Sequence, residues 1–447
     1  MSRSQFSYTR DQLMALSRIV IEHAARQGAT AADTEISEGV GQNVSVRQGE
    51  IETIEYNKDK GAGVTVYIGQ RRGHASTSDL SEAALKSAVE KALTIARYTA
   101  EDEAAGLPDA DRLAKDVPDL DLYHPWALSV EEAAERAKAC EAAALAVDKR
   151  LTNSEGAGVS LHASQFIYAN SLGFCNGYAG SRHGMSVAVI GEDKGGMQRD
   201  YWYTSARNAA ELESAESVGR IAGTRTVRRL NGRKLDTRTC PVLFEAPIAT
   251  GLIGNFVAAV SGGSLYRKSS FLLDSLGQQV FAPLVNIREQ PFIPSGLGSA
   301  PFDSEGVACL ERDIVKDGVL QGYFLSTYSA KKLGMKTTGN AGGSHNLIVT
   351  PGEHDLDGLL KQMGTGLLVT ELLGHGANMV TGDYSRGAAG FWVENGEIQY
   401  PVDELTIAGN LASMFPAIEA VGGDVDKRSH IQIGSLLIGR MTVAGVD

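Results

Sequence analysis

The chain has 447 residues, of which 43% are hydrophobic and 21% are charged, as in a soluble globular protein of two or three domains with an ample core. Its formal net charge of −12 argues against a general nucleic-acid-binding protein, because no basic stripe is available to neutralise phosphates. The sequence shows neither a basic and apolar N-terminal signal nor a run of about eighteen apolar residues, so a cytoplasmic protein without membrane spans is expected.

The four cysteines are far apart in the sequence and form no Cys-x-x-Cys pair; they are Cys140, Cys175, Cys240 and Cys309. This pattern favours buried free thiols over a disulfide or a metal site. The 51 glycines indicate a protein rich in turns and short strands.

Residues 1–105 are predicted to form an α/β unit in which two helices enclose a run of strands. Thr9 and Gln12 have capping-box spacing, and an apolar stripe of helical period follows them. Alternating segments then predict strands over residues 32–38, 42–48, 50–57, 61–68 and 73–77, separated by glycines. A second helix is expected to begin at Ser78 or Asp79.

Residues 106–128 are predicted to be a linker. The segment is acidic, shows no clear period and carries Pro108, Pro118 and Pro125.

The same order of elements recurs over residues 129–235. Ser129 and Glu132 form a second capping box before a helix, and strands are predicted over residues 159–163, 165–170, 175–183, 185–190 and 198–205, followed by a helix over 211–230. Residues 37–41 also resemble 154–158, and residues 64–69 resemble 186–191. We therefore predict a duplicated helix–β-meander–helix region; chance similarity of two glycine-rich meanders is the alternative.

Residues 236–447 are predicted to form a mainly antiparallel-β domain, which gives the chain an α+β fold class. Asp317-Gly318 and Asn395-Gly396 each lie between short apolar strands, as in two-residue hairpins. Further strands are expected over residues 347–350, 366–372, 431–437 and 440–444, and a helix over 402–421 with a bend at Pro416.

Residues 241–271 predict a strand, a buried helix, a glycine turn and a polar surface. The helix is expected to begin at Ala249 or Thr250 and to stop at the pair Gly262-Gly263. A metallopeptidase helix needs two ligands one turn apart with a carboxylate beside them. No His, Asp, Glu or Cys lies between Pro247 and Ser269, so this helix lacks those groups.

This segment and a second one over residues 374–392 resemble the PmbA (TldE) branch of the PmbA/TldD family, historically labelled modulator of DNA gyrase and classed as metallopeptidases. The resemblance runs over nearly the whole chain. In the TldD branch the equivalent helix carries His-Glu-x-x-x-His, and a Cys near the C-terminus completes a zinc site. Alignment on Arg267-Lys268 places other residues at those positions, namely Gly254, Asn255 and Ala259, and no Cys lies within residues 426–430. The resemblance thus implies a chain with no catalytic residue, metal or cofactor of its own.

The resemblance further implies a heterodimer with a TldD-like subunit that supplies the zinc, its bound water and a Glu. Such peptidases take small or unfolded peptides, with family roles in processing a microcin precursor and degrading an antitoxin. This chain would form the second wall of the peptide chamber. Its C-terminal domain is the expected dimerisation surface, and a homodimer of the isolated chain through the same face is a further expectation.

Two polar groups are candidates for contact with a peptide or partner. Tyr266, Arg267 and Lys268 follow the glycine turn, in the segment that by resemblance holds the active-site rim; a solvated helix end is the alternative. The second group lies between two predicted strands and contains His375, Asn378, Asp383, Tyr384 and Arg386. It could line a cleft in which an extended peptide adds as a strand, or it could be a structural turn network.

The first alternative function is a self-sufficient metallopeptidase with ligands drawn from His345, His354, His375 and Asp383. Glu371 and His375 have the spacing of helical ligands, but residues 367–371 predict a strand, along which four residues span roughly 13 Å. No Gly-x-Ser-x-Gly elbow or complete dinucleotide motif is present. The second alternative is an interaction module that acts on gyrase without proteolysis.

Overall fold

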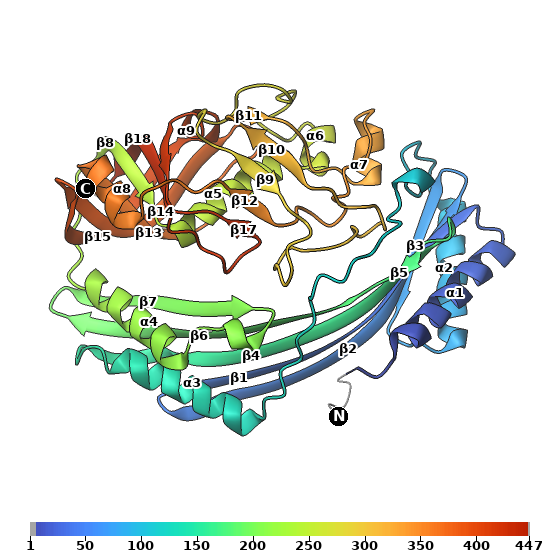
Figure 1. Cartoon of the computed structure of the whole chain (residues 1–447), viewed down its shortest axis with the longest axis horizontal. Helices are drawn as coiled ribbons and strands as arrows, with labels where there is room; N and C mark the ends of the chain where they lie inside the picture. Colours follow the sequence, from blue (N-terminus) through green and yellow to red (C-terminus); the bar gives the residue numbers. More distant parts are fainter. Residues whose placement is uncertain (1–5, 446–447) are drawn as a thin grey trace.

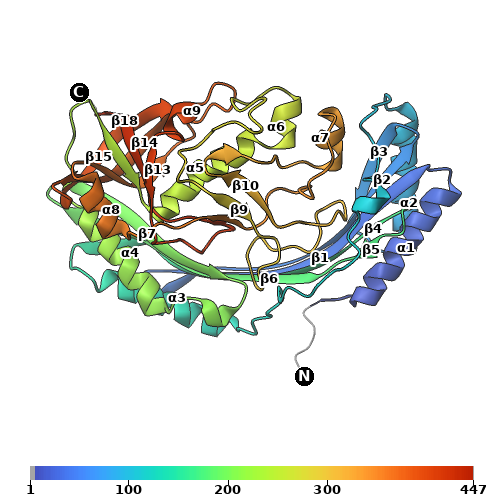
Figure 2. The same cartoon turned by 45° about the horizontal axis from the view of Figure 1, so that its top comes forward.

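The computed structural model describes residues 6–445 and has the α+β architecture that the sequence predicts. A long, curved antiparallel sheet carries helices on its convex side, and a C-terminal domain lies on its concave side (Figure 1). The turned view shows the same sheet curving beneath the C-terminal domain (Figure 2). None of the helices within residues 6–445 has the length and hydropathy needed to cross a lipid bilayer.

The first half of the large sheet is a three-stranded meander between two helices. Its elements are α1 (Arg10–Arg26), β1 (Ala31–Arg47), β2 (Glu50–Ile68), β3 (Arg71–Thr77) and α2 (Glu82–Tyr98). The capping box predicted at the start of α1 is confirmed, because Gln12 N donates to Thr9 Oγ1 and Thr9 N donates to Gln12 Oε1. Helix α2 begins after the N-cap Ser81, slightly later than expected.

The prediction of five short strands in this half is wrong, because four of them merge into two long strands. Gly39 and Gly41 lie inside β1, where they pair with β2 on one side and with β4 on the other. A glycine keeps the backbone donor and acceptor of a ladder, so it does not end a strand that neighbours hold on both sides.

The second half repeats this order with α3 (Val130–Leu145), β4 (Leu151–Asn170), β5 (Cys175–Asn176), β6 (Ala179–Asp193), β7 (Gly196–Ala206) and α4 (Ala215–Arg229). Its capping box at Ser129 and Glu132 is confirmed. Predicted strands merge here as well, within β4 and β6. Because β1 pairs with β4, both halves form one seven-stranded sheet in the order β3-β2-β1-β4-β6-β7, with β5 on β4.

The two faces of this sheet differ in chemistry. Apolar residues of the convex face form two separate cores, one beneath α1 and α2 and the other beneath α3 and α4. Alternate residues of β1 point to the concave side and are mostly short and polar: Asp33, Glu35, Ser37, Asn43 and Ser45. Along β1 the concave side is therefore not covered by an apolar core, and a small aromatic cluster covers part of β4 instead.

Residues 106–128 contain no α-helix or strand, only a 3₁₀ turn over Ala110–Arg112. The segment is nevertheless held between the sheet and the C-terminal domain. Leu120 O accepts from Ser295 N at 2.8 Å, and Leu122 O accepts from Ser181 N at 2.9 Å.

The C-terminal domain contains a six-stranded sheet, β15-β14-β13-β8-β18-β16, and a five-stranded sheet, β11-β10-β9-β12-β17. The strands are β8 (Arg238–Phe244), β9 (Ile287–Glu289), β10 (Arg312–Lys316), β11 (Val319–Leu320), β12 (Leu347–Val349), β13 (Gly366–Leu373), β14 (Asp383–Glu394), β15 (Glu397–Asn410), β16 (Ile418–Val421), β17 (Ile431–Gln432) and β18 (Leu436–Ala444). The helices are α5 (Ala246–Ala259), α6 (Gly262–Tyr266), α7 (Thr327–Lys332), α8 (Leu356–Met363) and α9 (Leu411–Met414). Most pairings are antiparallel, as predicted, while β8–β13 and β12–β17 are parallel.

Both predicted hairpins are confirmed. Asp317-Gly318 joins β10 to β11 and Asn395-Gly396 joins β14 to β15, with positive φ at all four residues. Asn, Asp and Gly tolerate this left-handed region better than other residues, which is why the two dipeptides predict turns.

The predicted helix over residues 402–421 is wrong. This stretch contains the second half of β15, the short helix α9 and β16. Strand β15 pairs with its hairpin neighbour β14 along most of its length and, over Thr406–Ala408, also with β18 near the C-terminus. Tertiary pairing of this kind overrides local helical preference.

Candidate functional site: the cleft between the sheet and the C-terminal domain

Helix α5, to which the resemblance directs attention, begins earlier than predicted. Glu245 is its N-cap residue and Pro247 lies in its first turn. A proline fits there because the first N–H groups of a helix have no partner within the helix. The glycine pair also differs from the prediction, since Gly262 begins the short helix α6 instead of ending α5.

One face of α5 is open and carries small residues. The core-facing residues are Ala246, Ala249, Leu252, Ile253, Phe256 and Ala259. On the other side Gly251 and Ala258 are exposed, and Gly254 and Asn255 are half-buried. A Cβ atom added at Gly251 or Gly254 would meet no other heavy atom within 4 Å. Space therefore remains beside this face of the helix.

The three positions aligned with the zinc motif do not fit a zinc ion. Gly254 and Ala259 have no donor atoms in their side chains, and the Asn255 side chain offers only an amide. Ala259 is fully buried, and its carbonyl oxygen accepts from Ser270 Oγ at 2.7 Å. Zinc sites in proteins are built from Cys sulfur, His nitrogen and carboxylate oxygen, none of which is present here.

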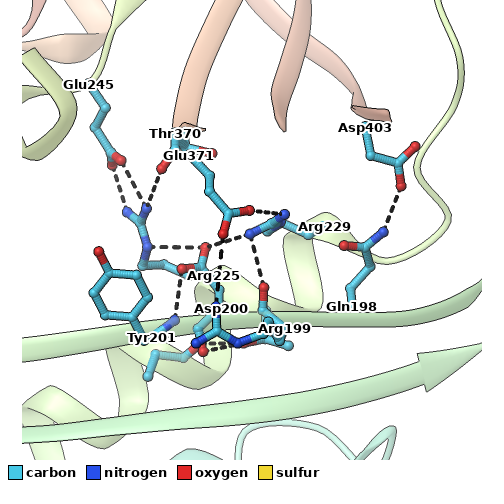
Figure 3. A network of polar contacts seen from close by, with 12 residues as sticks. Gln198, Arg199, Asp200, Tyr201, Arg225, Arg229, Glu245, Thr370, Glu371 and Asp403 are labelled. Atoms are coloured by element: carbon cyan, nitrogen blue, oxygen red, sulfur yellow. Dashed lines mark hydrogen bonds and ion pairs between the residues drawn. The ribbon is translucent and has the colours of Figure 1, made fainter. Parts of the chain in front are cut away.

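The N-terminus of α5 is fixed by a charged network that joins the large sheet to the C-terminal domain (Figure 3). Arg225 of α4 donates from Nη1 and Nη2 to the two carboxylate oxygens of Glu245, at 2.7 and 2.9 Å. Its Nε lies 3.3 Å from Asp200 Oδ2 on β7. The three side chains are 15%, 16% and 6% exposed, so this ion-pair group is largely withdrawn from water.

The same network reaches β13 through a second arginine. Arg229 forms an ion pair with Glu371 and donates from Nη1 to Arg199 O at 2.9 Å. Burial by itself lowers the pKa of Arg225, but Glu245 and Asp200 outweigh it and hold that pKa above its ordinary range. Arg225 is therefore a permanently charged link between the sheet and the C-terminal domain, and Arg229 provides a second ion pair beside it.

Two further groups of contacts join the C-terminal domain to the N-terminal part near the other end of the sheet. The Phe302 ring packs edge-on against the rings of Phe174 and Tyr178, with centroids 5.0 and 5.6 Å away. Asp102, which follows α2, accepts from Tyr328 Oη and from Lys332 Nζ, each at 2.7 Å. The concave face is thus bridged at both ends.

Between these contacts the concave side is hollowed. A hollow of about 840 Å³ lies over β1, β2 and β3; its lining includes Asp33, Glu35, His74, Tyr168 and Ser304. A neighbouring hollow of about 430 Å³ shares Glu35 and Ser304 and extends to Asp303 and His345. A third, of about 1010 Å³, shares His74 and extends to Glu305 and Tyr328. The three hollows share lining residues, and this polar region of the concave side, here called the cleft, has room for a peptide segment.

Two carboxyl groups of this cleft keep their protons to unusually high pH. Burial raises the pKa of Asp33 to about 7, against the opposing effects of Thr65 and Arg72. Burial also raises the pKa of Asp303 to about 7, and the charge of nearby Glu305 adds to the increase. The charge of the cleft therefore changes near neutral pH.

The segment that follows α6 contacts the loop between β13 and β14. Phe271 N, shortly after α6, donates to Met379 O in the loop between β13 and β14 at 2.8 Å. Tyr266 is half-buried, with its ring 5.7 Å from that of Tyr328, while Arg267 and Lys268 are exposed. Folding thus brings Phe271 against the loop that contains the second polar group, and no hydrogen bond or ion pair joins that loop to the first group within residues 6–445.

The polar side chains of the loop bond mainly to one another. Asp383 accepts from Thr381 Oγ1 at 2.7 Å and from Asn410 Nδ2 at 3.0 Å, and these hydrogen bonds lower its pKa. Asn378 Oδ1 accepts from Val380 N, and Arg386 donates to Gly374 O. Tyr384 is buried, which raises its pKa to about 12. These are the contacts of a turn network, and a role in peptide or partner contact stays a prediction.

The four residues of the metallopeptidase alternative are not brought together. His345 is buried, with Nε2 2.9 Å from Gly339 O and 3.1 Å from Cys309 Sγ. His354 and His375 are exposed, and Asp383 belongs to the turn network. Within residues 6–445 no three His, Cys, Asp or Glu side chains are grouped so as to hold a metal ion.

Neither the charged network nor the polar cleft could be predicted from the sequence. Asp33 and Asp303 are 270 positions apart, and the sequence around each is that of an ordinary strand or turn. Only the alternation of β1, with polar residues at every second position, indicates that one face of this strand is not buried in an apolar core.

Comparison with known proteins agrees with this architecture. Three sequence models, described as PmbA/TldA metallopeptidase domain 1, central domain and C-terminal domain, match residues 32–96, 123–230 and 237–445. The chain is 51% identical to Metalloprotease PmbA of Escherichia coli O157:H7 over 414 residues, which cover 93% of this chain and 92% of that protein. It is 50% identical to the Metalloprotease PmbA homolog of Haemophilus influenzae over 426 residues, 95% and 94% of the two chains.

The chain belongs to the PmbA branch of the PmbA/TldD family. A crystal structure from Bacteroides thetaiotaomicron, whose name links it to DNA gyrase, has the same fold with a TM-score of 0.92 and 28% identity, over 97% of this chain and 98% of that one. Membership of this family supports a role in proteolysis at the level of the family.

Proposed function

We propose that this chain is the zinc-free, TldE-like subunit of a cytoplasmic TldD/TldE-type peptidase. It forms one wall of the chamber in which a peptide is held, and a TldD-like subunit supplies the zinc ion and its bound water. The proposal rests on the lack of zinc-binding side chains on α5, where Gly254, Asn255 and Ala259 occupy the positions of the zinc motif. Zinc has no ligands there, so bond cleavage requires a second subunit.

The polar concave cleft supports the role of chamber wall. An extended peptide carries one backbone N–H and one C=O per residue, which need partners when water is excluded. Serine side chains and Asn43 on the concave face of the curved sheet can supply them without selecting a particular side chain. Small or unfolded peptides are the substrates that such a surface suits, and by resemblance these include a microcin precursor and an antitoxin.

The C-terminal domain is the surface proposed to meet the TldD-like subunit. Phe271 contacts Met379 there, and Arg267, Lys268 and His375 of the two segments are exposed. Several large apolar side chains in the same part of the domain are also exposed: Leu273 at 37%, Leu276 at 42% and Val380 at 56%. Apolar side chains rimmed by charges are typical of a protein–protein interface.

The test compares three samples: this chain alone, the TldD-like chain of the same organism alone, and their equimolar mixture. Each is assayed for hydrolysis of an unstructured peptide with and without a zinc chelator, and its zinc content is measured. We expect chelator-sensitive hydrolysis in the mixture, with the zinc bound by the TldD-like chain. Stoichiometric zinc in this chain, together with chelator-sensitive hydrolysis by this chain alone, would overturn the proposal.

A further inference from the structure

Arg182 lies on the concave side of the large sheet, which faces the C-terminal domain (Figure 1). On β6 it shares a register with His162 of β4 and Gly41 of β1, and its Nε donates to Ser205 Oγ on β7 at 2.9 Å. Arg182 is exposed, and its Nη1 and Nη2 atoms have no hydrogen-bond or ion-pair partner within residues 6–445. A guanidinium carries five N–H donors, so four of them are free to bind another molecule.

Arg182 lines a hollow of about 440 Å³ over β1, β4, β6 and β7, here called the Arg182 hollow. Neutral polar side chains, among them Asn43, Ser160 and Ser186, also line it. No aspartate or glutamate of the described chain is among its lining residues. A guanidinium that lies among neutral hydrogen-bonding groups, with no acid to neutralise it, is suited to bind an anion.

Two histidines lie close to Arg182. His162 is its neighbour across the ladder, and Cβ atoms added at two glycines of β1 would lie 3.7 and 3.6 Å from the His162 ring, so this ring extends over β1. His430 comes from the C-terminal domain, in the loop that Arg428 fixes to β7 by donating to Tyr203 O at 2.9 Å. Burial lowers the pKa of His430, and the charge of Arg182 lowers it further.

A second arginine near Arg182 also lacks an acidic partner within residues 6–445. Arg207 donates only to backbone carbonyl oxygens in the described chain, at 2.9 to 3.3 Å. Burial lowers the pKa of Arg207; the charge of Tyr178 opposes this effect and that of Arg182 adds to it. Neither arginine is therefore paired with a carboxylate of residues 6–445, although the net charge of the chain is −12.

The opposite end of the concave side carries carboxyl groups. Asp33, Glu35 and Asp303 line the cleft there, and Glu35 is exposed without an ion-pair partner in the described chain. Glu35 precedes Gly41, which shares the register of Arg182, by six residues on β1, a distance of roughly 20 Å. A carboxylate is therefore attracted to the Arg182 hollow and repelled by the cleft.

We propose that the Arg182 hollow binds a carboxylate of the peptide that the concave face holds. This inference rests on the proposed function, in which the concave face is a wall of the peptide chamber. The free Nη atoms of Arg182 can donate to both oxygens of a carboxylate, and the hydroxyl groups of Ser160 and Ser186 can donate beside them. The carboxylate of the C-terminus places that end of the peptide at β6 and β7 and its N-terminal end toward Glu35. Aspartate and glutamate side chains are the second source of the same group.

Peptide binding to the full chain alone, measured by fluorescence anisotropy, tests the site. The probe is an unstructured peptide of about ten residues, labelled at its N-terminus, with either a free C-terminal carboxylate or a C-terminal amide. We expect the amide to bind about tenfold more weakly. Arg182→Gln should abolish this difference by weakening the free acid alone, and Arg182→Lys should keep part of it. Arg26→Gln is the matched control and should keep the whole difference, because it removes the same charge from a side chain that is 69% exposed on α1.

Equal affinity of the unchanged chain for the two peptides, or a preference for the acid that survives in Arg182→Gln, would overturn the proposal. A third peptide carries a glutamate next to a C-terminal amide. Tight binding of this peptide that requires Arg182 would assign the site to carboxylates in general, and weak binding would assign it to the C-terminus. The assay measures binding and not hydrolysis, so its result does not depend on which subunit holds the zinc, and the two proposals can fail separately.

Photo-crosslinking locates the peptide without any change to the protein. A benzophenone side chain is placed next to the C-terminal residue in one peptide and at the N-terminal residue in a second one. We expect the first peptide to label β4, β6 or β7 around Arg182, and the second to label β1, β2 or β3 around Glu35. The reverse pattern, or the same labelled segments for both peptides, would contradict a carboxylate held at Arg182.

Discussion

The charged network of Figure 3 makes a quantitative prediction for Arg225→Met. Arg225 is the common partner of Glu245 and Asp200, whose side chains are 16% and 6% exposed. Removing it leaves the Glu245 carboxylate without an ion-pair partner at the N-cap of α5 and leaves Asp200 with only Arg229, at 3.8 Å. Breaking a buried ion pair from one side costs about 3–5 kcal/mol, because the remaining charge stays buried and unpaired.

The assay is urea denaturation of the full chain, with Arg26→Met as the matched control. Arg26 pairs with Glu22 on the surface of α1, where the side chains are 69% and 62% exposed, so its loss should cost less than about 0.5 kcal/mol. Arg225→Met is expected to lower the free energy of unfolding by about 3–5 kcal/mol, and Glu245→Gln by a smaller amount since Asp200 keeps its partner. A loss of less than about 1 kcal/mol in Arg225→Met would refute the reasoning that this network is buried and fixes α5 to the sheet.

Three further predictions concern Phe256, Asp33 and the aligned positions of α5. Phe256→Ala should cost about 3–5 kcal/mol in urea denaturation, because this fully buried ring packs 4.9 Å from Phe281; a cost below about 1 kcal/mol would contradict the packing. Burial raises the pKa of Asp33 to about 7 in the folded chain, whereas the ordinary aspartate pKa in the unfolded chain is near 4. The contribution of Asp33 to the free energy of unfolding is therefore complete below about pH 4 and is lost as the pH rises to 7. Asp33→Asn should therefore flatten the fall of unfolding free energy between pH 4 and 7 and stabilise the chain at pH 8; an unchanged pH profile would show that Asp33 titrates normally. Installing the zinc motif with Gly254→His, Asn255→Glu and Ala259→His should lower the melting temperature, because Ala259 has no exposed surface; a stable variant that binds zinc would show that α5 can accommodate the motif.

Local signals in the sequence determined the parts of the fold that depend on a few neighbouring residues. The capping boxes at Thr9 and Ser129 were predictable because each needs only a side chain and a backbone group three residues away. The turns at Asp317-Gly318 and Asn395-Gly396 follow from residues that tolerate positive φ. The lack of zinc ligands on α5 is likewise a property of composition, visible without coordinates.

Long-range pairing decided what the sequence did not reveal. Residues 402–410 are a strand because they pair with β14 and, over 406–408, also with β18. Gly39 lies inside a strand because β2 and β4 pair with it on both sides. The cleft of Asp33 and Asp303 and the network of Arg225, Glu245 and Glu371 join segments that are far apart in the chain. The residues next to a carboxylate in the sequence do not predict its ion-pair partner or its pKa. Both depend on burial and neighbouring charge, which exist only once the sheet has folded around the C-terminal domain.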